Sequence, residues 1–122
     1  MWYNGRAMFE IRKAVLENGK CPFDDWRAAL VPLTRGRVDR AVARLGVGVF
    51  TNCRSISGVA GLYELRMDFG PGIRVYYGRE GATVVLLLCG GDKSTQGADI
   101  AKASRMWREY KEGVKDGNKG LS

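Results

Sequence analysis

Basic side chains near the middle of the chain have the chemistry needed to bind phosphate. Arg66 and Arg74 lie on either side of a Gly-Pro-Gly turn, and Lys93 follows two glycines and Asp92 after a run of apolar residues. A guanidinium group holds two phosphate oxygens in a planar fork, and the lysine ammonium group adds a compact positive charge. Together these residues could hold a phosphate chain if the fold brings them to one surface.

Two predicted strands determine whether Arg66 and Arg74 meet. Apolar and polar residues alternate over residues 62–67 and again over residues 73–77, as is typical of half-buried strands. If the strands pair across the turn with an even register sum, Arg66 and Arg74 lie on one face of the sheet. The same face would carry Glu64 and Tyr76. It could be a phosphate-binding surface or an ordinary solvated surface, and the alternation leaves both interpretations open.

A third predicted strand leads toward Lys93. Residues 83–89 are apolar and mostly branched, as expected of a central strand that is covered on both faces. The sequence GGDKST that follows resembles the end of a phosphate-binding P-loop, because it comes after a strand and before a helix. However, Asp92 occupies the position that needs glycine before the lysine, and the earlier glycine of the motif is absent. We therefore exclude a nucleoside triphosphatase.

The lack of histidine narrows the possible chemistry. The chain contains no histidine, which excludes Ser-His-Asp and Cys-His catalysis, the usual zinc sites and the histidine pair of many ribonucleases. Cleavage of RNA would have to use arginine, lysine, tyrosine or carboxylate side chains, and we expect neither a metal ion nor a cofactor. The three cysteines lack a CxxC spacing and are predicted to be free thiols in a reducing cytosol.

Length and charge indicate one small domain with a polyanionic partner. A chain of 122 residues is long enough for one modest hydrophobic core. Its 20 basic and 13 acidic residues give a formal net charge of +7, which favours nucleic acid as a partner without separating RNA from DNA or from an acidic protein. No apolar run approaches the length of a membrane span, so we predict a cytoplasmic protein without membrane contact.

The other predicted elements are one strand and three helices. The strand is expected within residues 8–14, and a short helix begins at Pro22 and ends before Pro32. Ser94 or Thr95 is expected to cap the last helix. Apolar residues at helical spacing should pack that helix on the sheet, and these are Ile100, Ala103, Trp107 and Tyr110.

The second predicted helix carries a ridge of arginines. Thr34 is expected to cap this helix, which continues to about Leu45. Arg37, Arg40 and Arg44 recur at i, i+3 and i+7 on one side of it. The ridge could bind an RNA backbone, or it could be a solvated face, which is the more common role of a charged run.

The sequence ELRMDFGPGIRVYY, followed by LLLCGGDKSTQ, resembles the signature of the RelE/ParE superfamily of toxin–antitoxin toxins. The similarity is greatest to the HigB-like addiction module killer proteins, and it extends upstream through FEIRKAV and CPFDDW and downstream to about Tyr110. It implies a single RelE-like α+β domain over residues 8–112, with a twisted, mainly antiparallel sheet, two N-terminal helices and a C-terminal helix. Residues 1–7 would then be a flexible leader and residues 113–122 a flexible tail.

The resemblance also implies an activity and the residues that carry it. HigB-like toxins are metal-independent endoribonucleases (mRNA interferases) that act on the ribosome, with the substrate 2′-OH attacking the phosphate. Arg74 in GPGIR matches the arginine that stabilises the transition-state phosphate, and Arg66 in ELR matches a basic position that binds the backbone or assists proton transfer. Lys93 in GGDK would neutralise the leaving group. Secondary candidates for contact with RNA are Tyr76 and Asp92. The general base stays open, because some relatives use a histidine that this chain lacks.

The partners implied by the resemblance are a small helix-turn-helix antitoxin, mRNA, and the ribosome with its rRNA. Operator DNA would be contacted only through the antitoxin. Two alternatives to the nuclease stay open, namely a ParE-like, non-enzymatic gyrase inhibitor and an inactive RNA-binding remnant. The presence of Arg66, Arg74 and Lys93 favours the nuclease, because ParE-type toxins generally lack that basic set.

Overall fold

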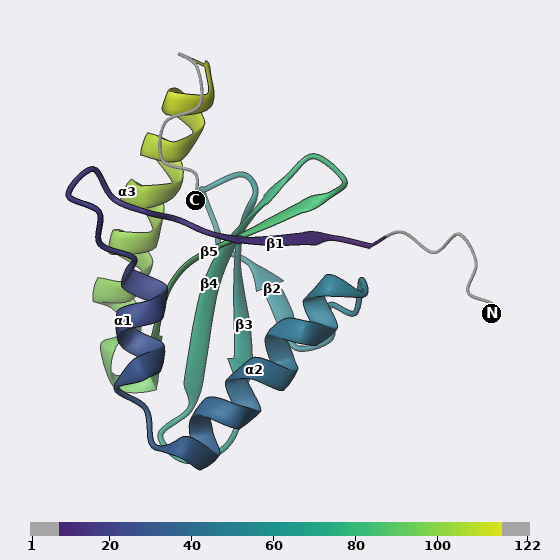
Figure 1. Cartoon of the computed structure of the whole chain (residues 1–122), viewed down its shortest axis with the longest axis vertical. Helices are drawn as coiled ribbons and strands as arrows, with labels where there is room; N and C mark the ends of the chain where they lie inside the picture. The colour runs from purple at the N-terminus through teal and green to yellow at the C-terminus, as the bar shows by residue number, and fades with distance from the viewer. Residues whose placement is uncertain (1–7, 116–122) are drawn as a thin grey trace.

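The computed structural model describes residues 8–115 and forms an α+β domain (Figure 1). Its strands are β1 (Glu10–Lys13), β2 (Cys53–Ser55), β3 (Leu62–Met67), β4 (Ile73–Glu80) and β5 (Val84–Asp92). Its helices are α1 (Pro22–Ala28), α2 (Pro32–Gly46) and α3 (Gln96–Lys115), and a short 3-10 helix, η1 (Lys93–Thr95), joins β5 to α3. The fold class predicted from the sequence, with two N-terminal helices and one C-terminal helix, is confirmed at this level.

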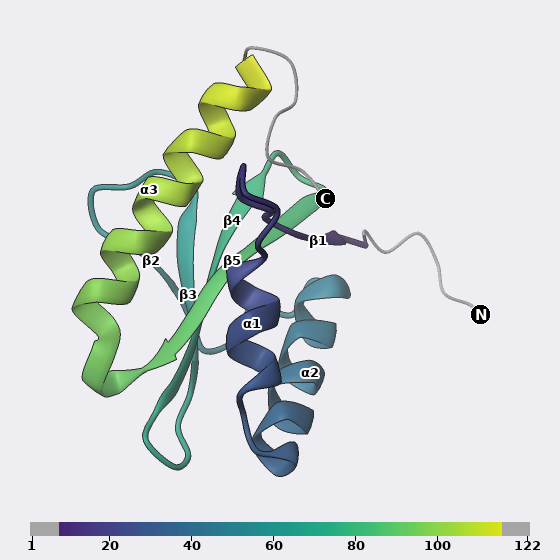
Figure 2. The ribbon, with the colours of Figure 1, turned by 60° about the vertical axis from the view of Figure 1, so that its left-hand side comes forward.

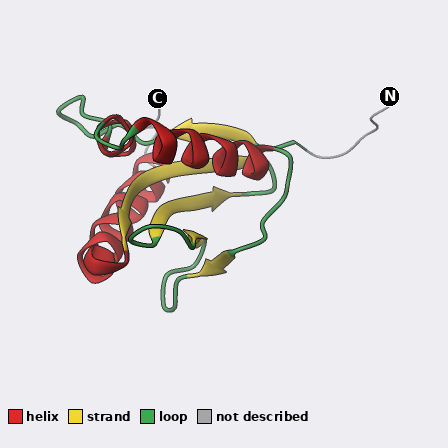
Figure 3. Ribbon diagram, turned by 90° about the horizontal axis from the view of Figure 1, so that it is seen from below, coloured by secondary structure: helices red, strands yellow, loops and turns green. Residues whose placement is uncertain are grey.

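The five strands form one sheet in the order β1-β5-β4-β3-β2, and they twist strongly across it (Figure 3). β1 pairs with β5 in parallel, whereas all other neighbours are antiparallel, so the sheet is mixed but mainly antiparallel. Arg66 lies directly opposite Arg74, and Glu64 lies opposite Tyr76. The pairing therefore meets the condition of an even register sum, and Arg66 and Arg74 share one face of the sheet.

Helices cover both faces of the sheet (Figures 1 and 2). α1 and α2 pack on one face through a core that includes Phe23, Val38 and Leu45. α3 packs on the other face through the buried residues Ala103, Met106, Trp107 and Tyr110, which confirms the predicted docking of this helix on the sheet. Alternate residues of β5 contribute to the two cores, which is the pattern predicted for a central strand covered on both sides.

Two prolines set the boundaries of the N-terminal helices. Pro22 and Pro32 each occupy the first turn of a helix. Backbone N–H groups in this turn form no hydrogen bond within the helix, so proline loses none there, and its fixed φ suits the helix. The prediction that Thr34 caps α2 is wrong, because the helix already begins at Pro32 and the preceding Val31 offers no side-chain cap. The short connection between α1 and α2 keeps both helices on the same face of the sheet.

Asp92, rather than Ser94 or Thr95, caps the segment that leads into α3. Its carboxylate accepts hydrogen bonds from the backbone N–H of Ser94 at 2.9 Å and from the Ser94 hydroxyl at 2.6 Å. In return, the Thr95 hydroxyl oxygen accepts a hydrogen bond from the Asp92 amide at 3.3 Å, which completes a capping box. The predicted cap is thus corrected. Because β5 passes into α3 through this single turn, the start of α3 lies next to the end of the sheet.

Close packing of α3 on the sheet depends on a glycine in β4. A Cβ atom at Gly78 would overlap the ring of Trp107, whose Nε1–H donates a hydrogen bond to the Ala60 carbonyl at 2.9 Å. α3 ends at Lys115, so it continues into the segment predicted as a tail from residue 113. The predicted leader over residues 1–7 and the rest of the tail, residues 116–122, lie outside the described residues.

Candidate functional site

The residues predicted to be catalytic lie together at one end of the sheet. Arg66 on β3 and Arg74 on β4 face each other across the strand pair, and Lys93 follows β5 in η1. Gly72, in the turn between β3 and β4, has a φ of 79°. A Cβ atom on Gly72 would lie 3.1 Å from Arg74 Nη1 and 3.3 Å from Lys93 Cβ. The turn approaches both basic residues closely because position 72 has no side chain.

α3 covers the face of the sheet that carries Arg74 and Tyr76. Arg74 is only 2% exposed, and Tyr76 is fully buried. Gly91 pairs with Arg74 in the sheet, and a Cβ atom there would overlap the carboxylate of Asp99 in the first turns of α3. The expectation of an open face, whether phosphate-binding or solvated, is therefore wrong at Arg74 and Tyr76. This face is closed because α3 docks on it, and strand alternation by itself does not predict that docking.

Glu64 is a buried carboxylate at the centre of this cluster. It is 2% exposed and accepts hydrogen bonds from the Tyr76 hydroxyl at 3.2 Å and from Gln96 Nε2 at 2.6 Å. Its two oxygens also lie 3.8 Å from the Nε atoms of Arg66 and Arg74, at ion-pair distance. A buried carboxylate needs such partners, because it has lost its hydration. Glu64 therefore fixes the position of both guanidinium groups relative to α3.

The two arginines keep hydrogen-bond donors that nothing in the described part of the chain satisfies. Arg74 Nε, Arg74 Nη1 and Arg66 Nε are buried and have no hydrogen-bond partner within residues 8–115. At 3.8 Å the carboxylate of Glu64 attracts these groups but is too distant for a hydrogen bond. Buried donors are normally paired with protein or water oxygens, so oxygens from outside the described chain would complete these guanidinium groups. Arg66 keeps 32% of its side chain exposed and connects this cluster with solvent.

Tyr76 and Asp92 serve the cluster in different ways. Burial, followed by the nearby Glu64 carboxylate, raises the pKa of Tyr76, so its hydroxyl stays protonated at neutral pH. The hydrogen bond from the Ser94 hydroxyl is the main cause that lowers the pKa of Asp92, and the positive charge of Arg74 lowers it further. Asp92 therefore stays ionised and is occupied as the cap of η1. Neither side chain is set to exchange protons near neutral pH.

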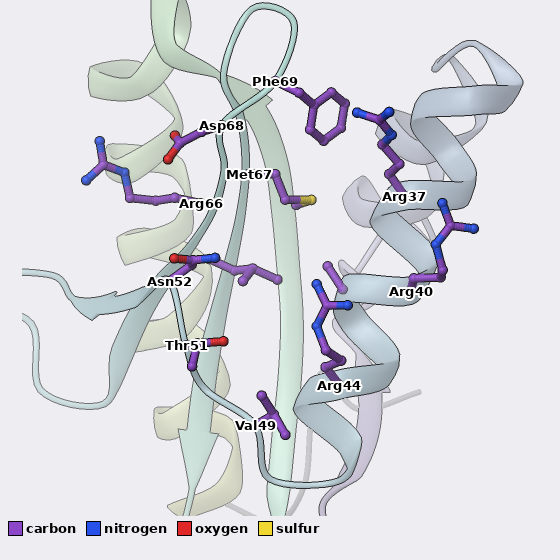
Figure 4. Close-up of a pocket in the computed structure, with 12 residues that line it drawn as sticks. Arg37, Arg40, Arg44, Val49, Thr51, Asn52, Arg66, Met67, Asp68 and Phe69 are labelled. Carbon is purple, nitrogen blue, oxygen red and sulfur yellow. The ribbon is translucent and has the colours of Figure 1, made fainter.

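A second group of predicted residues lines a groove on the other face of the sheet. This basic groove, of about 260 Å³, lies between α2 and the segment that includes β3 (Figure 4). Its lining residues are Arg37, Arg40, Ala41, Arg44, Val49, Thr51, Asn52, Leu65, Arg66, Met67, Asp68 and Phe69. Although Arg66 contributes to the lining, its side chain points away from α2, as does that of Asp68 (Figure 4).

The structure thus divides the predicted site residues into two sets. Arg74 and Tyr76 lie under α3, and Asp92 and Lys93 lie where β5 passes into α3. The arginine ridge of α2 lies on the opposite side of the sheet, and Arg66 also contributes to the groove there. Sequence reasoning missed Gln96, whose partner Glu64 is 32 positions away in the chain. The alternation of β3 did place Glu64 on the correct face, but no local pattern connects it with the first residue of α3.

Other reactive groups in the described structure do not form a centre of their own. Burial raises the pKa of the Cys89 thiol to about 12, so this cysteine stays protonated and is a poor nucleophile. Within residues 8–115, no three His, Cys, Asp or Glu side chains gather as a metal site would require. In the same part of the chain, no helix has both the length and the apolar character needed to cross a membrane.

Comparison with known proteins adds one relative. Over 88 residues the chain is 40% identical to an uncharacterized protein of Haemophilus influenzae, and the match covers 71% of this chain and 87% of that protein. No protein-family model matches the sequence, and no solved structure matches it. The extent and identity of the match show that the chain belongs to the same family as this Haemophilus influenzae protein.

Proposed function

We propose that the protein is the toxin of a type II toxin–antitoxin system and that it cleaves mRNA on the ribosome in the cytoplasm. The observation that supports this function most strongly is the cross-strand pair of Arg66 and Arg74, whose buried Nε and Nη1 donors lack partners within residues 8–115. Lys93 lies beside the pair across the Gly72 turn. The signature that resembles RelE and HigB-like toxins contains the same three residues.

In the proposed reaction, RNA supplies its own nucleophile. The 2′-oxygen forms a bond to phosphorus as the bond from phosphorus to the 5′-oxygen breaks, which leaves a 2′,3′-cyclic phosphate and a 5′-hydroxyl. Arg74 would bind two phosphate oxygens in its planar fork as their negative charge grows. Arg66 would contact the same phosphate from the partly exposed side, and Lys93 would neutralise the leaving oxygen. The chain then contributes orientation and charge stabilisation, which are large effects in phosphate chemistry.

Access to Arg74 requires a movement of α3 in this proposal. Arg74 is 2% exposed, and the first residue of α3, Gln96, is hydrogen-bonded to Glu64 beside it. In this proposal a phosphate would reach the guanidinium group of Arg74 after the first turn of α3 moves away from the sheet. We infer that the described conformation is closed and that substrate binds to an opened one.

The burial of Arg74 also favours a second candidate function. An arginine held under a helix by Glu64 is compatible with a purely structural ion cluster. In that case the protein would act through its surface, like a ParE-type gyrase inhibitor, without cleaving RNA. An inactive RNA-binding remnant would show the same burial.

The deciding experiment is a cleavage assay on ribosome-bound mRNA. We expect wild-type protein to produce fragments that end in a 2′,3′-cyclic phosphate or a 3′-phosphate. A message with 2′-deoxyribose at the cut site should bind but resist cleavage, because it lacks the nucleophile. Gyrase supercoiling is assayed in parallel with the same protein. Intact mRNA together with inhibited gyrase would favour the ParE-like function, and cleavage of the deoxy message would contradict the proposed mechanism.

A further inference from the structure

The arginines that face the basic groove are not paired with carboxylates of the described chain. α2 carries four arginines and one aspartate. Arg35 donates to the Leu30 carbonyl at 2.8 Å, and Asp39 pairs with Arg27 at 2.6 Å, so these charges hold α1 against α2. The other three are Arg37, Arg40 and Arg44, which are exposed and form no ion pair with any residue among positions 8–115.

Three unpaired cations along one helix ridge repel each other, because residues three and four apart are neighbours on a helix surface. The carboxylate of α2 is turned to α1 through its pair with Arg27. Asp68 also lines the groove, but its side chain points away from the ridge (Figure 4). No carboxylate within residues 8–115 therefore pairs with the ridge.

The rest of the groove has the chemistry of a nucleotide site. Its floor is apolar, with the buried residues Ala41, Leu65 and Met67. The amide of Asn52 lies on the side opposite α2 (Figure 4), and a carboxamide can bind the edge of a base. Arg37 Cζ lies 4.5 Å above the ring centroid of Phe69, which gives one end of the groove a flat, cationic surface for a base.

We propose that the basic groove binds a single-stranded segment of RNA, with Arg37, Arg40 and Arg44 on successive phosphates and the bases toward the apolar floor. This assignment rests on the proposed nuclease function for the choice of RNA. The arginines are spaced three and four residues apart, which is a rise of about 4.5 and 6 Å along the helix axis. A strand that lies along α2 therefore meets one guanidinium after another.

One turn connects the groove with the predicted catalytic cluster. Phe69 lies at the groove, and Gly72 lies against Arg74. The two belong to the same turn, because the Gly72 N–H donates to the Phe69 carbonyl at 3.0 Å. A strand that leaves the groove past Phe69 reaches the Arg74 side of the sheet after crossing this turn. The groove would then hold nucleotides that flank the cleaved phosphate.

The test is a fluorescence anisotropy titration of the full chain with a short, labelled, single-stranded 2′-O-methyl RNA, which cannot be cleaved because its 2′-oxygen is blocked. Replacing Arg37, Arg40 and Arg44 together by alanine should weaken binding by about tenfold or more between about 50 and 200 mM salt. The slope of log affinity against log salt should become shallower by about 2, since each phosphate contact in a single strand contributes about 0.7.

A matched control removes three exposed cations from the opposite side of the molecule. Lys102, Arg105 and Arg108 lie on the exposed side of α3, and their joint replacement by alanine changes the net charge equally. This variant should bind with nearly the wild-type affinity and salt slope. If the triple variant of the ridge fails to fold, Arg40→Gln alone should still reduce the slope by about 0.7. Phe69→Leu should weaken binding without changing the slope, because it removes stacking and no charge.

Several outcomes would overturn the assignment. Equal losses of RNA affinity in the two triple variants would show that binding depends only on the net charge of the protein. An acidic peptide that binds wild-type protein through the ridge, with no binding of RNA, would assign the groove to a protein partner instead. The nuclease proposal and the groove proposal can fail separately. If RNA binds with this pattern but is never cut, the nuclease proposal is refuted and RNA binding in the groove is still supported. RNA that is cut with no dependence on the ridge refutes the groove alone.

Discussion

Gln96, the first residue of α3, donates a hydrogen bond of 2.6 Å to the buried carboxylate of Glu64 on β3. This contact joins the C-terminal helix to the strand pair that carries Arg66 and Arg74. Because Glu64 also lies 3.8 Å from the Nε atom of each arginine, the position of α3 and the position of the guanidinium groups depend on one carboxylate. The contact is therefore the first place to test how the helix covers the site.

Gln96→Ala should loosen the start of α3. A hydrogen bond to a carboxylate contributes about 1.5–3 kcal/mol, and its loss leaves Glu64 with one donor fewer in a buried position. We expect a lower free energy of unfolding in urea and faster amide hydrogen exchange over residues 93–99. Gly97→Ala is the control, because the space around Gly97 is open and alanine favours a helix. Unchanged exchange in Gln96→Ala would show that this contact does not hold α3 closed.

Arg74→Ala should reduce the single-turnover rate of mRNA cleavage by about a hundredfold or more, because it removes donors that act most strongly on the transition state. Arg74→Lys should recover little of the rate, since a point charge cannot form the planar two-oxygen fork. Arg66→Ala and Lys93→Ala should slow cleavage as well. Arg108→Ala, on the exposed side of α3, is the matched control and should cut normally. Cleavage by Arg74→Ala at the wild-type rate would exclude Arg74 from the reaction.

Gly78→Ala should destabilise the fold, because the new methyl group overlaps the ring of Trp107. Overpacking of this kind costs about 1–3 kcal/mol, measured as the free energy of unfolding in urea. Combining Gly78→Ala with Trp107→Leu should cost less than the sum of the two single changes, because the smaller side chain leaves room for the methyl group. Gly36→Ala in α2 is the control, since its new methyl group would meet only the flexible Arg40 side chain. Full additivity in the double variant would contradict the packing at this contact.

Stability should fall at low pH as the pair between α1 and α2 is lost. Hydrogen bonds from Arg27 are the main cause that lowers the pKa of Asp39 in the folded chain. A carboxyl group with a lowered folded-state pKa contributes stability above its unfolded pKa of about 3.9, and this contribution disappears as the pH falls below that value. Urea unfolding of Asp39→Asn across this range should show a weaker pH dependence than wild type. Arg27→Gln should remove the same dependence, because it takes away the donor of the pair.

The sequence determined the local elements and the pairing of the central strands. Alternation with a period of two predicted β3 and β4, and it placed Arg66 and Arg74 on one face on the condition of an even register sum, which the structure has. Pro22 marked the start of α1, and the apolar run of β5 indicated a strand covered on both sides. These features follow from short-range geometry, because a side chain's face depends only on its position in a strand or helix.

The tertiary structure alone decided what covers each face. Whether Arg74 lies in solvent or under α3 depends on how a helix docks on the sheet, and strand periodicity contains no information about that contact. The same holds for Gln96, which meets Glu64 across 32 positions of sequence. The arginines of α2 form a ridge in any helix, but they line a groove only because α2 packs beside β3. Local patterns fix the direction of a side chain, whereas burial and shared sites arise from contacts between elements distant in the chain.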